Sequence, residues 1–204
     1  MPLEQPDPIV LRNARAGDEL AFSLIVRAYE TPVFNYVLRV TGDRSLAEDM
    51  TQEVFLKVFQ SLHTFGERAL FTTWLFQVTK NRVLDELRSR ERRPKAAAQL
   101  DELPELECVD QPIERHETMD AVWRALQVMP VDLKMALLLR DIVGLSYNEI
   151  AEVLEITLAT TKWRIFKARE FVQEALAREG LDAGLGDGGA AQPGRLRALG
   201  SEPA

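Results

Sequence analysis

Apolar residues recur at the spacing of an α-helix along most of this chain, and no convincing run alternates strictly between apolar and polar residues. Over residues 45–61, for example, one face of a helix would carry Ala47, Met50, Val54 and Val58. Because no segment has the pattern of a β-strand, nothing in the chain indicates a sheet. The sequence therefore predicts an all-α fold.

Glycines and prolines divide this pattern into separate helices. Gly42 and Gly144 are expected to end two of them, and Pro32 is expected to kink or split the long helix in which it lies. The predicted helices cover residues 7–16, 18–41, 45–61, 70–90, 115–128, 131–143, 146–154 and 157–177.

Two helix starts carry the pattern of a capping box, in which a serine is followed three residues later by a glutamate. Ser45 and Glu48 form one such pair, and Ser146 and Glu149 form the other. We expect each serine to cap the helix that follows it.

Charge is distributed unevenly along the chain. The net charge of −7 taken alone argues against nucleic-acid binding. Residues 77–95, however, hold seven basic and three acidic side chains, and residues 158–170 hold four basic and one acidic. Residues 96–121 lie between these blocks and hold eight acidic side chains against one basic. This pattern predicts two nucleic-acid contacts separated by a segment with another role.

Composition also sets the domain boundaries. Residues 94–114 contain three prolines and an alanine run, which is typical of a linker. We expect two small helical domains, 1–93 and 115–179, joined by this flexible acidic linker. The tail, 180–204, is rich in Gly and Ala and is expected to be disordered.

Residues 146–169 predict a helix-turn-helix, because a short capped helix, a brief turn and a longer basic helix follow one another. Glu155 lies where such a turn often needs a left-handed residue, at a cost of about 1 kcal/mol for a residue other than Gly. One side of the second helix should pack on the first, and it carries Thr161, Ile165, Ala168 and Val172.

The opposite side of this second helix combines aromatic and basic residues. A core does not need two large aromatic side chains there, whereas a helix that faces DNA could place them against thymine methyl groups, with Lys and Arg on phosphates and guanine edges. A three-helix bundle with a solvated basic face remains the alternative. The residues on or beside this side are Lys162, Trp163, Phe166, Lys167 and Arg169.

A polar stripe on the predicted helix 45–61 includes an isolated leucine. Acidic side chains around a single Leu suit docking of a basic partner, although an ordinary solvated face would look the same. The stripe consists of Asp49, Gln52, Glu53, Leu56 and Gln60.

Aromatic residues precede the basic helix in residues 62–88. Aromatic rings beside positive charge suit single-stranded DNA, because bases stack on the rings while cations hold the backbone. Phe71 and Trp74 have helical spacing and could equally belong to the core, so Phe65, in the loop 63–69, is the better contact candidate. The basic helix carries Lys80, Asn81, Arg82 and Arg88.

Two parts of the chain resemble the sigma-70 family of bacterial RNA polymerase sigma factors, in its extracytoplasmic-function subfamily. The fourth domain of that family resembles the run LLLRDIVGLSYNEIAEVLEITLATTKWRIFKAR, and the second domain resembles RSLAEDMTQEVFLKVFQSL and FTTWLFQVTKNRVLDELR. The resemblance covers most of residues 18–177. It implies a sigma factor that binds core polymerase and directs promoter recognition and transcription initiation.

The resemblance also implies roles for residues. In the fourth domain, Lys162, Trp163, Phe166 and Lys167 would face bases of the minus-thirty-five element, and Arg164 and Arg169 would bind phosphates. The family commonly has Ser where this chain has Trp163.

In the second domain, the loop 63–69 would capture a flipped base of the minus-ten element. The residues expected to contact this element are Phe65, Lys80, Asn81, Arg82 and Arg88. The helix 45–61 would bind the clamp coiled coil of the largest polymerase subunit. The residues expected there are Asp49, Gln52, Glu53 and Leu56.

Several function classes are not supported. One cysteine, Cys108, argues against an internal disulfide framework and a Cys-based zinc site, and the two distant histidines, His63 and His116, argue against a metal cluster. No cofactor is expected. The sequence shows neither a catalytic triad nor a nucleotide-binding loop, so an enzyme is not expected. No membrane span or secretory signal is apparent, so a cytoplasmic protein is expected.

Two questions stay open at this point. A stand-alone helix-turn-helix regulator that binds duplex DNA is the alternative function, and residues 44–90 separate the two, since such a regulator needs no polymerase-docking helix. The acidic linker could thread through polymerase channels or serve as a simple tether. Factors of this family are often held by an anti-sigma protein, but no residue pattern identifies one.

Overall fold

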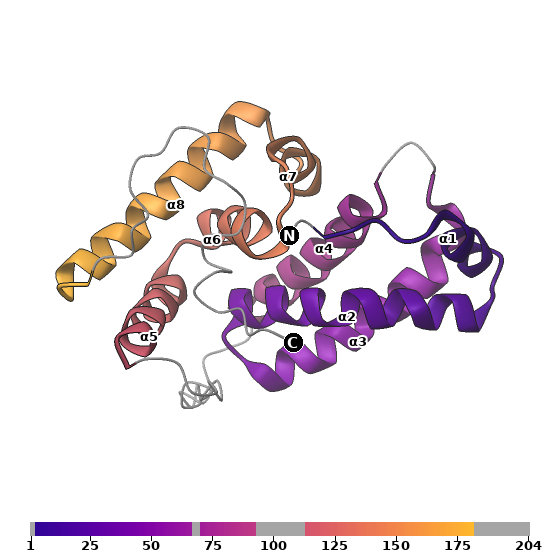
Figure 1. The fold of residues 1–204 in the computed structure, drawn as a ribbon, viewed down its shortest axis with the longest axis horizontal. Coiled ribbons are helices and arrows are strands. Elements are labelled where there is room, and N and C mark those ends of the chain that lie inside the picture. Colours follow the sequence, from indigo (N-terminus) through magenta and orange to yellow (C-terminus); the bar gives the residue numbers. More distant parts are fainter. Residues whose placement is uncertain (1–2, 67–69, 93–112, 182–204) are drawn as a thin grey trace. The chain divides into compact units, whose positions relative to one another are not determined.

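The computed structural model describes residues 3–66, 70–92 and 113–181, and all regular secondary structure in those ranges is helical, as the sequence predicts. Contacts divide the chain into two compact units, one holding α1 to α4 and the other α5, α6, η2, most of α7 and α8 (Figure 1). The elements are α1 (Pro8–Arg15), α2 (Glu19–Thr41), α3 (Arg44–Ser61), η1 (Leu62–Thr64), α4 (Phe71–Arg92), α5 (Ile113–Val128), α6 (Val131–Leu138), η2 (Leu139–Val143), α7 (Tyr147–Leu154) and α8 (Leu158–Arg178).

Most of the predicted acidic linker 94–114 and of the predicted tail 180–204, together with Cys108, lies outside the described residues. The predicted roles of the linker therefore stay predictions. None of the helices in the described ranges combines the length and the apolar content that a membrane crossing requires.

In the first unit, α2 packs against α1 and α3, and α4 packs against α2 and α3. The core forms where the apolar faces of these helices meet. The Tyr36 and Phe76 rings meet edge to face at 5.6 Å between centroids, and Tyr29 meets Phe71 at 5.3 Å. Aromatic pairs in this geometry add about 0.5–1.5 kcal/mol beyond the burial of their area. The arc predicted to be buried on α3 is buried: Ala47, Met50, Val54 and Val58.

The start of α3 differs from the prediction. Asp43 caps this helix, accepting a hydrogen bond from the Leu46 amide at 2.9 Å, and this bond lowers the pKa of the Asp43 carboxyl. The expected capping box at Ser45 and Glu48 is therefore wrong, because a carboxylate stands two residues earlier and begins the helix first. Glu48 instead pairs with Arg44 at 3.1 Å.

The second capping box is confirmed. The Ser146 amide donates to the Glu149 carboxylate at 2.8 Å, and the Glu149 amide donates to the Ser146 hydroxyl at 3.2 Å. Two backbone amides that would otherwise lack a partner at the start of α7 are satisfied in this reciprocal way.

Pro32 does not split α2, which stays helical from Glu19 to Thr41. A proline in a helix removes one hydrogen bond to the carbonyl four residues earlier, here that of Ala28. Ala28 is exposed, so water can take the place of the missing donor. Gly42 ends the helix as predicted, in a left-handed conformation with φ of 72°.

In the second unit, α5 and α6 pack against α8. The stretch from α7 to α8 forms the predicted helix-turn-helix, with Glu155 in the left-handed region at φ 56° and Thr157 capping α8. The side of α8 predicted to pack inward is buried: Thr161, Ile165, Ala168 and Val172.

A buried ion pair fixes α8 to η2. Asp141 is 1% exposed, and its carboxylate accepts from the Arg169 guanidinium at 2.7 Å and 3.3 Å. The neighbouring Arg140 donates to the Leu145 carbonyl at 2.8 Å and lies over the Tyr147 ring at 4.7 Å. Arg169 and Arg140 therefore provide hydrogen bonds to a carboxylate of η2 and to the carbonyl that follows it in the chain at Leu145.

We predict that Asp141→Ala lowers the free energy of unfolding by about 3–5 kcal/mol, because the partly buried charge of Arg169 would lose its buried partner. Urea denaturation followed by circular dichroism measures this loss. Asp132→Ala is the matched control. It also removes the partner of an arginine, Arg164, but at an exposed carboxylate, so less than about 1 kcal/mol should be lost. Equal losses in the two variants would contradict this view of the buried pair.

Candidate functional surfaces

The outer face of α8 presents two aromatic rings to solvent. Trp163 is 56% exposed and Phe166 is 55% exposed, and Lys162 is exposed beside them. The Lys167 ammonium lies 5.8 Å from the Phe166 ring centroid and 2.6 Å from the Glu170 carboxylate. Apolar rings flanked by cations on one helix face can contact both the base edges and the phosphates of a duplex.

The two arginines predicted to bind phosphate are engaged within the protein. Arg164 donates to Asp132 at 2.7 Å. Arg169 lies against the buried Asp141, so the expectation that it belongs to the outer face is wrong. Sequence reasoning missed Asp141, although an acidic residue within the apolar run LLLRDIV was a signal that a buried partner was needed.

The stripe predicted on α3 is exposed on that helix, with Asp49, Gln52 and Leu56 open to solvent. Glu53, another member, forms an ion pair with Arg82 of α4. Arg82 also donates to Glu86 at 3.2 Å. One residue expected to bind polymerase and one expected to bind DNA therefore hold each other in this structure.

Phe65 is buried, with 4% of its surface exposed. Its ring centroid lies 5.9 Å from that of Phe71 and 5.3 Å from that of Trp74. Two aromatic residues at the start of α4 therefore enclose the Phe65 ring, and its expected contact with the minus-ten element stays a prediction.

Of the basic helix, only part faces outward. Lys80 is 5% exposed, so this structure does not present it on the surface, and its expected contact with DNA stays a prediction. Phe76 and Val83, four residues before it and three after it, share its face of α4 and are buried. Asn81 and Arg88 are exposed, as a contact with DNA requires.

A basic hollow beside Phe65 was not predicted. It has a volume of about 370 Å³ and lies between the N-terminal segment, α1 and the start of α4. Arg12 and Arg15 of α1 line it together with the half-exposed Leu70. Gln5 fixes one wall, because its amide donates to the Thr72 hydroxyl at 2.6 Å. No periodicity in the sequence relates residues so far apart.

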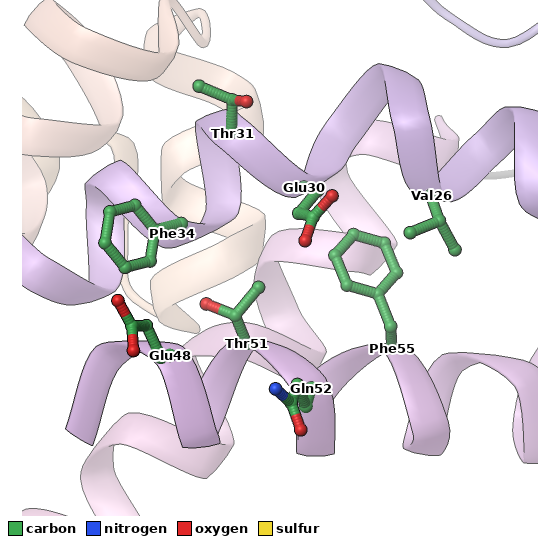
Figure 2. A pocket seen from close by; sticks show the side chains of 8 residues that line it. All are labelled: Val26, Glu30, Thr31, Phe34, Glu48, Thr51, Gln52 and Phe55. Carbon is green, nitrogen blue, oxygen red and sulfur yellow. The ribbon is translucent and has the colours of Figure 1, made fainter. Parts of the chain in front are cut away.

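A second hollow is a groove of about 510 Å³ between α2 and α3 (Figure 2). Glu30 and Phe34 line it from α2, and Glu48, Gln52 and Phe55 line it from α3. Gln52 also belongs to the exposed stripe of α3, so the groove opens beside that stripe.

Family models match both units. The model described as Sigma-70 region 2 matches residues 25–93, and the model described as Sigma-70, region 4 matches residues 119–172. The RNA polymerase sigma-H factor of Pseudomonas aeruginosa is 32% identical over 183 residues, which cover 85% of this chain and 95% of the relative. The ECF RNA polymerase sigma-E factor of Escherichia coli K12 is 32% identical over 178 residues, or 81% of this chain and 92% of the relative.

Solved structures share the fold. The structure of CnrH in complex with the cytosolic domain of CnrY has a TM-score of 0.66 at 21% identity, and the match covers 85% of this chain and 99% of CnrH. The sigma factor RpoE from Bartonella quintana, solved with the anti-sigma factor NepR, has a TM-score of 0.61 at 20% identity, with 76% and 96% covered.

We predict that Phe65→Ala lowers the free energy of unfolding by about 3–5 kcal/mol, as expected for an aromatic side chain removed from a core. Urea denaturation measures it. Leu70→Ala, at a half-exposed neighbour of the same cluster, should cost less than about 1 kcal/mol. A Phe65→Ala protein as stable as the wild type would mean that the ring is free to meet a ligand after all.

Proposed function

This chain belongs to the extracytoplasmic-function subfamily of the sigma-70 family, and we propose that its two units divide polymerase and promoter contacts between them. As a sigma factor, it binds core RNA polymerase and directs promoter recognition and transcription initiation. The observation that carries this function is the match of the region 2 and region 4 models, in that order, to the two compact units.

We assign the domains along the same lines. Residues 1–93 act as the second sigma domain, which binds polymerase and the minus-ten element. Residues 115–179 act as the fourth domain, which binds the minus-thirty-five element. Residues 94–114 link them, and residues 180–204 form a tail.

The exposed stripe of α3 is the proposed docking site for the clamp coiled coil of the largest polymerase subunit. Asp49, Gln52 and Leu56 supply one charge, one hydrogen-bonding amide and one apolar contact, which together suit a basic amphipathic surface. Glu53 can join this contact when it leaves Arg82.

The outer face of α8 is the proposed reader of the minus-thirty-five element. Lys162 and Lys167 lie where they can reach phosphates or guanine edges, while Trp163 and Phe166 offer apolar surface to the thymine methyl group. Arg164 is a phosphate contact only if it leaves Asp132.

The basic hollow beside Phe65 is the proposed site for an unpaired base of the minus-ten element. Arg12 and Arg15 can hold the phosphates on either side of a base, with Asn81 and Arg88 of α4 as further contacts. Extruding a base costs a few kcal/mol of stacking, and binding the extruded base offsets this cost. Phe65 then serves as a wall of the site.

We further propose that the protein has no catalytic activity of its own and acts in the cytoplasm, where core polymerase and promoter DNA are found. RpoE of Bartonella quintana was solved with an anti-sigma factor, and a partner of that class is proposed for this chain. The stand-alone regulator is not favoured, because such a protein has no need of the region 2 match.

We expect the purified protein to join core polymerase and to produce run-off transcripts from defined start sites. Asp49→Arg should weaken binding to core by at least about tenfold, because the reversed charge meets a basic partner. Binding is measured by titration of labelled protein with core enzyme.

The matched control is Glu174→Lys, a charge reversal at an exposed carboxylate of α8 far from the stripe in sequence. It should leave affinity for core unchanged. A wild-type protein that binds duplex DNA tightly but never joins core polymerase would overturn the proposed function.

We expect Trp163 to read a thymine methyl group. In a promoter selected from a random library, replacing each upstream thymine by deoxyuridine removes only that methyl. At one of these positions the affinity of the holoenzyme for the promoter should fall about fourfold, because burial of one carbon contributes about 0.8 kcal/mol.

Trp163→Ser should make binding indifferent to the methyl at that position. Val128→Ser, at an exposed apolar residue of α5, should retain the full dependence. If removal of the methyl group leaves the affinity of the wild-type holoenzyme unchanged at every upstream thymine, the proposed contact of Trp163 is wrong.

A further inference from the structure

The groove between α2 and α3 is acidic at its rim and apolar at its floor. In Figure 2 the Glu30 carboxylate leans over the groove, with the Phe55 ring below it and Val26 to one side. Phe55 is buried and Val26 is half-buried, whereas Glu30 and Glu48 are exposed. None of the described residues that line the groove is basic. A long cationic side chain with an aliphatic stem fits this arrangement.

Two residues that line one end of the groove, Phe34 and Glu48, already bind an arginine of this chain. The Arg44 guanidinium pairs with Glu48 at 3.1 Å and lies over the Phe34 ring at 5.8 Å. The carboxylate and the aromatic ring bind the guanidinium together, through charge and through the face of the ring. The local chemistry therefore supports binding of arginine.

The other end has the same chemistry without the arginine. Within the described ranges, the side chain of Glu30 makes no ion pair or hydrogen bond, and Phe55 is the ring beneath it (Figure 2). Glu30 stands four residues after Val26, which is the spacing that separates Glu48 from Arg44. A valine thus occupies the position from which a cation would reach Glu30.

The groove is continuous with the proposed docking face for polymerase. Gln52 lines the groove and also belongs to the exposed stripe with Asp49 and Leu56. A segment that lies along the stripe on α3 therefore passes the mouth of the groove, and a long side chain from it can reach across to α2.

We propose that the open end of this groove receives an arginine side chain from the core-polymerase segment that docks on α3, with its guanidinium on Glu30 and its stem against Val26 and Phe55. This inference rests on the proposed function and extends the polymerase contact from α3 to α2. Arginine fits better than lysine, because its planar guanidinium binds a carboxylate with two donors while it lies flat on a ring.

The test compares full-length variants in titrations with purified core polymerase. Glu30→Gln removes the charge and keeps the shape, and it should weaken binding by roughly three- to tenfold and reduce the salt dependence of binding. Val26→Arg supplies an internal cation at the Arg44–Glu48 spacing, so it should close the groove and weaken binding to a similar degree. Glu19→Gln, at an exposed glutamate of the same helix outside the groove, should bind as the wild type does.

The outcomes separate this inference from the proposed function. If Glu30→Gln and Val26→Arg bind core as the wild type does while Asp49→Arg does not, polymerase docks on α3 alone and the groove is not used. If the wild type fails to bind core, the proposed function itself fails. Thermal denaturation of each variant must match the wild type, and a photo-crosslinker at Thr31 should label a basic segment of the largest subunit. A label elsewhere would overturn the choice of partner.

Discussion

Burial of one apolar face by each helix is the constraint on which the rest of this structure depends. The described residues form no sheet, so the core of each unit is made of apolar helix faces. Met50 of α3 and Phe76 of α4 are both fully buried in the core of the first unit. Because each face is buried at helical spacing, the opposite face is left free to carry charge. The proposed contacts of α3 and α8 therefore stand on helices whose rotation the core has already fixed.

In the second unit, polar groups fix the rotation of α8 about its own axis. Apolar side chains alone tolerate small rotations of a helix, whereas the Arg169 guanidinium reaches Asp141 through two hydrogen bonds with defined directions. Phe166 lies three residues before Arg169 on the same helix. A turn of α8 that buried Phe166 would also break the ion pair, so the exposure of the aromatic face depends on an interaction made by a neighbouring residue of the same helix.

Local signals were enough to predict most of the fold. Helix ends follow from short-range chemistry, as the reciprocal bonds of Ser146 and Glu149 show. Ser45 failed as a cap because Asp43 competes for the same role. The buried arcs of α3 and α8 were also predicted, since periodicity alone defines them.

The side chains whose surroundings were not predicted depend mostly on partners in other elements of the chain. Arg169 turns inward because of Asp141, which lies 28 residues away. Phe65 is enclosed by the rings of Phe71 and Trp74 from the next helix. Lys80 could have been recognised, because Phe76 and Val83 share its face. The basic hollow could not, since it joins α1 to the start of α4.

The ion pair between Glu53 and Arg82 connects the exposed stripe of α3 to the basic helix α4. A carboxylate that accepts a hydrogen bond from one guanidinium has less capacity left to accept from another. Any protein surface that captures Glu53 leaves Arg82 with Glu86 as its remaining partner among the described residues. Binding of a partner to the exposed stripe of α3 therefore changes the charge that α4 can offer, because Arg82 is shared between Glu53 and Glu86.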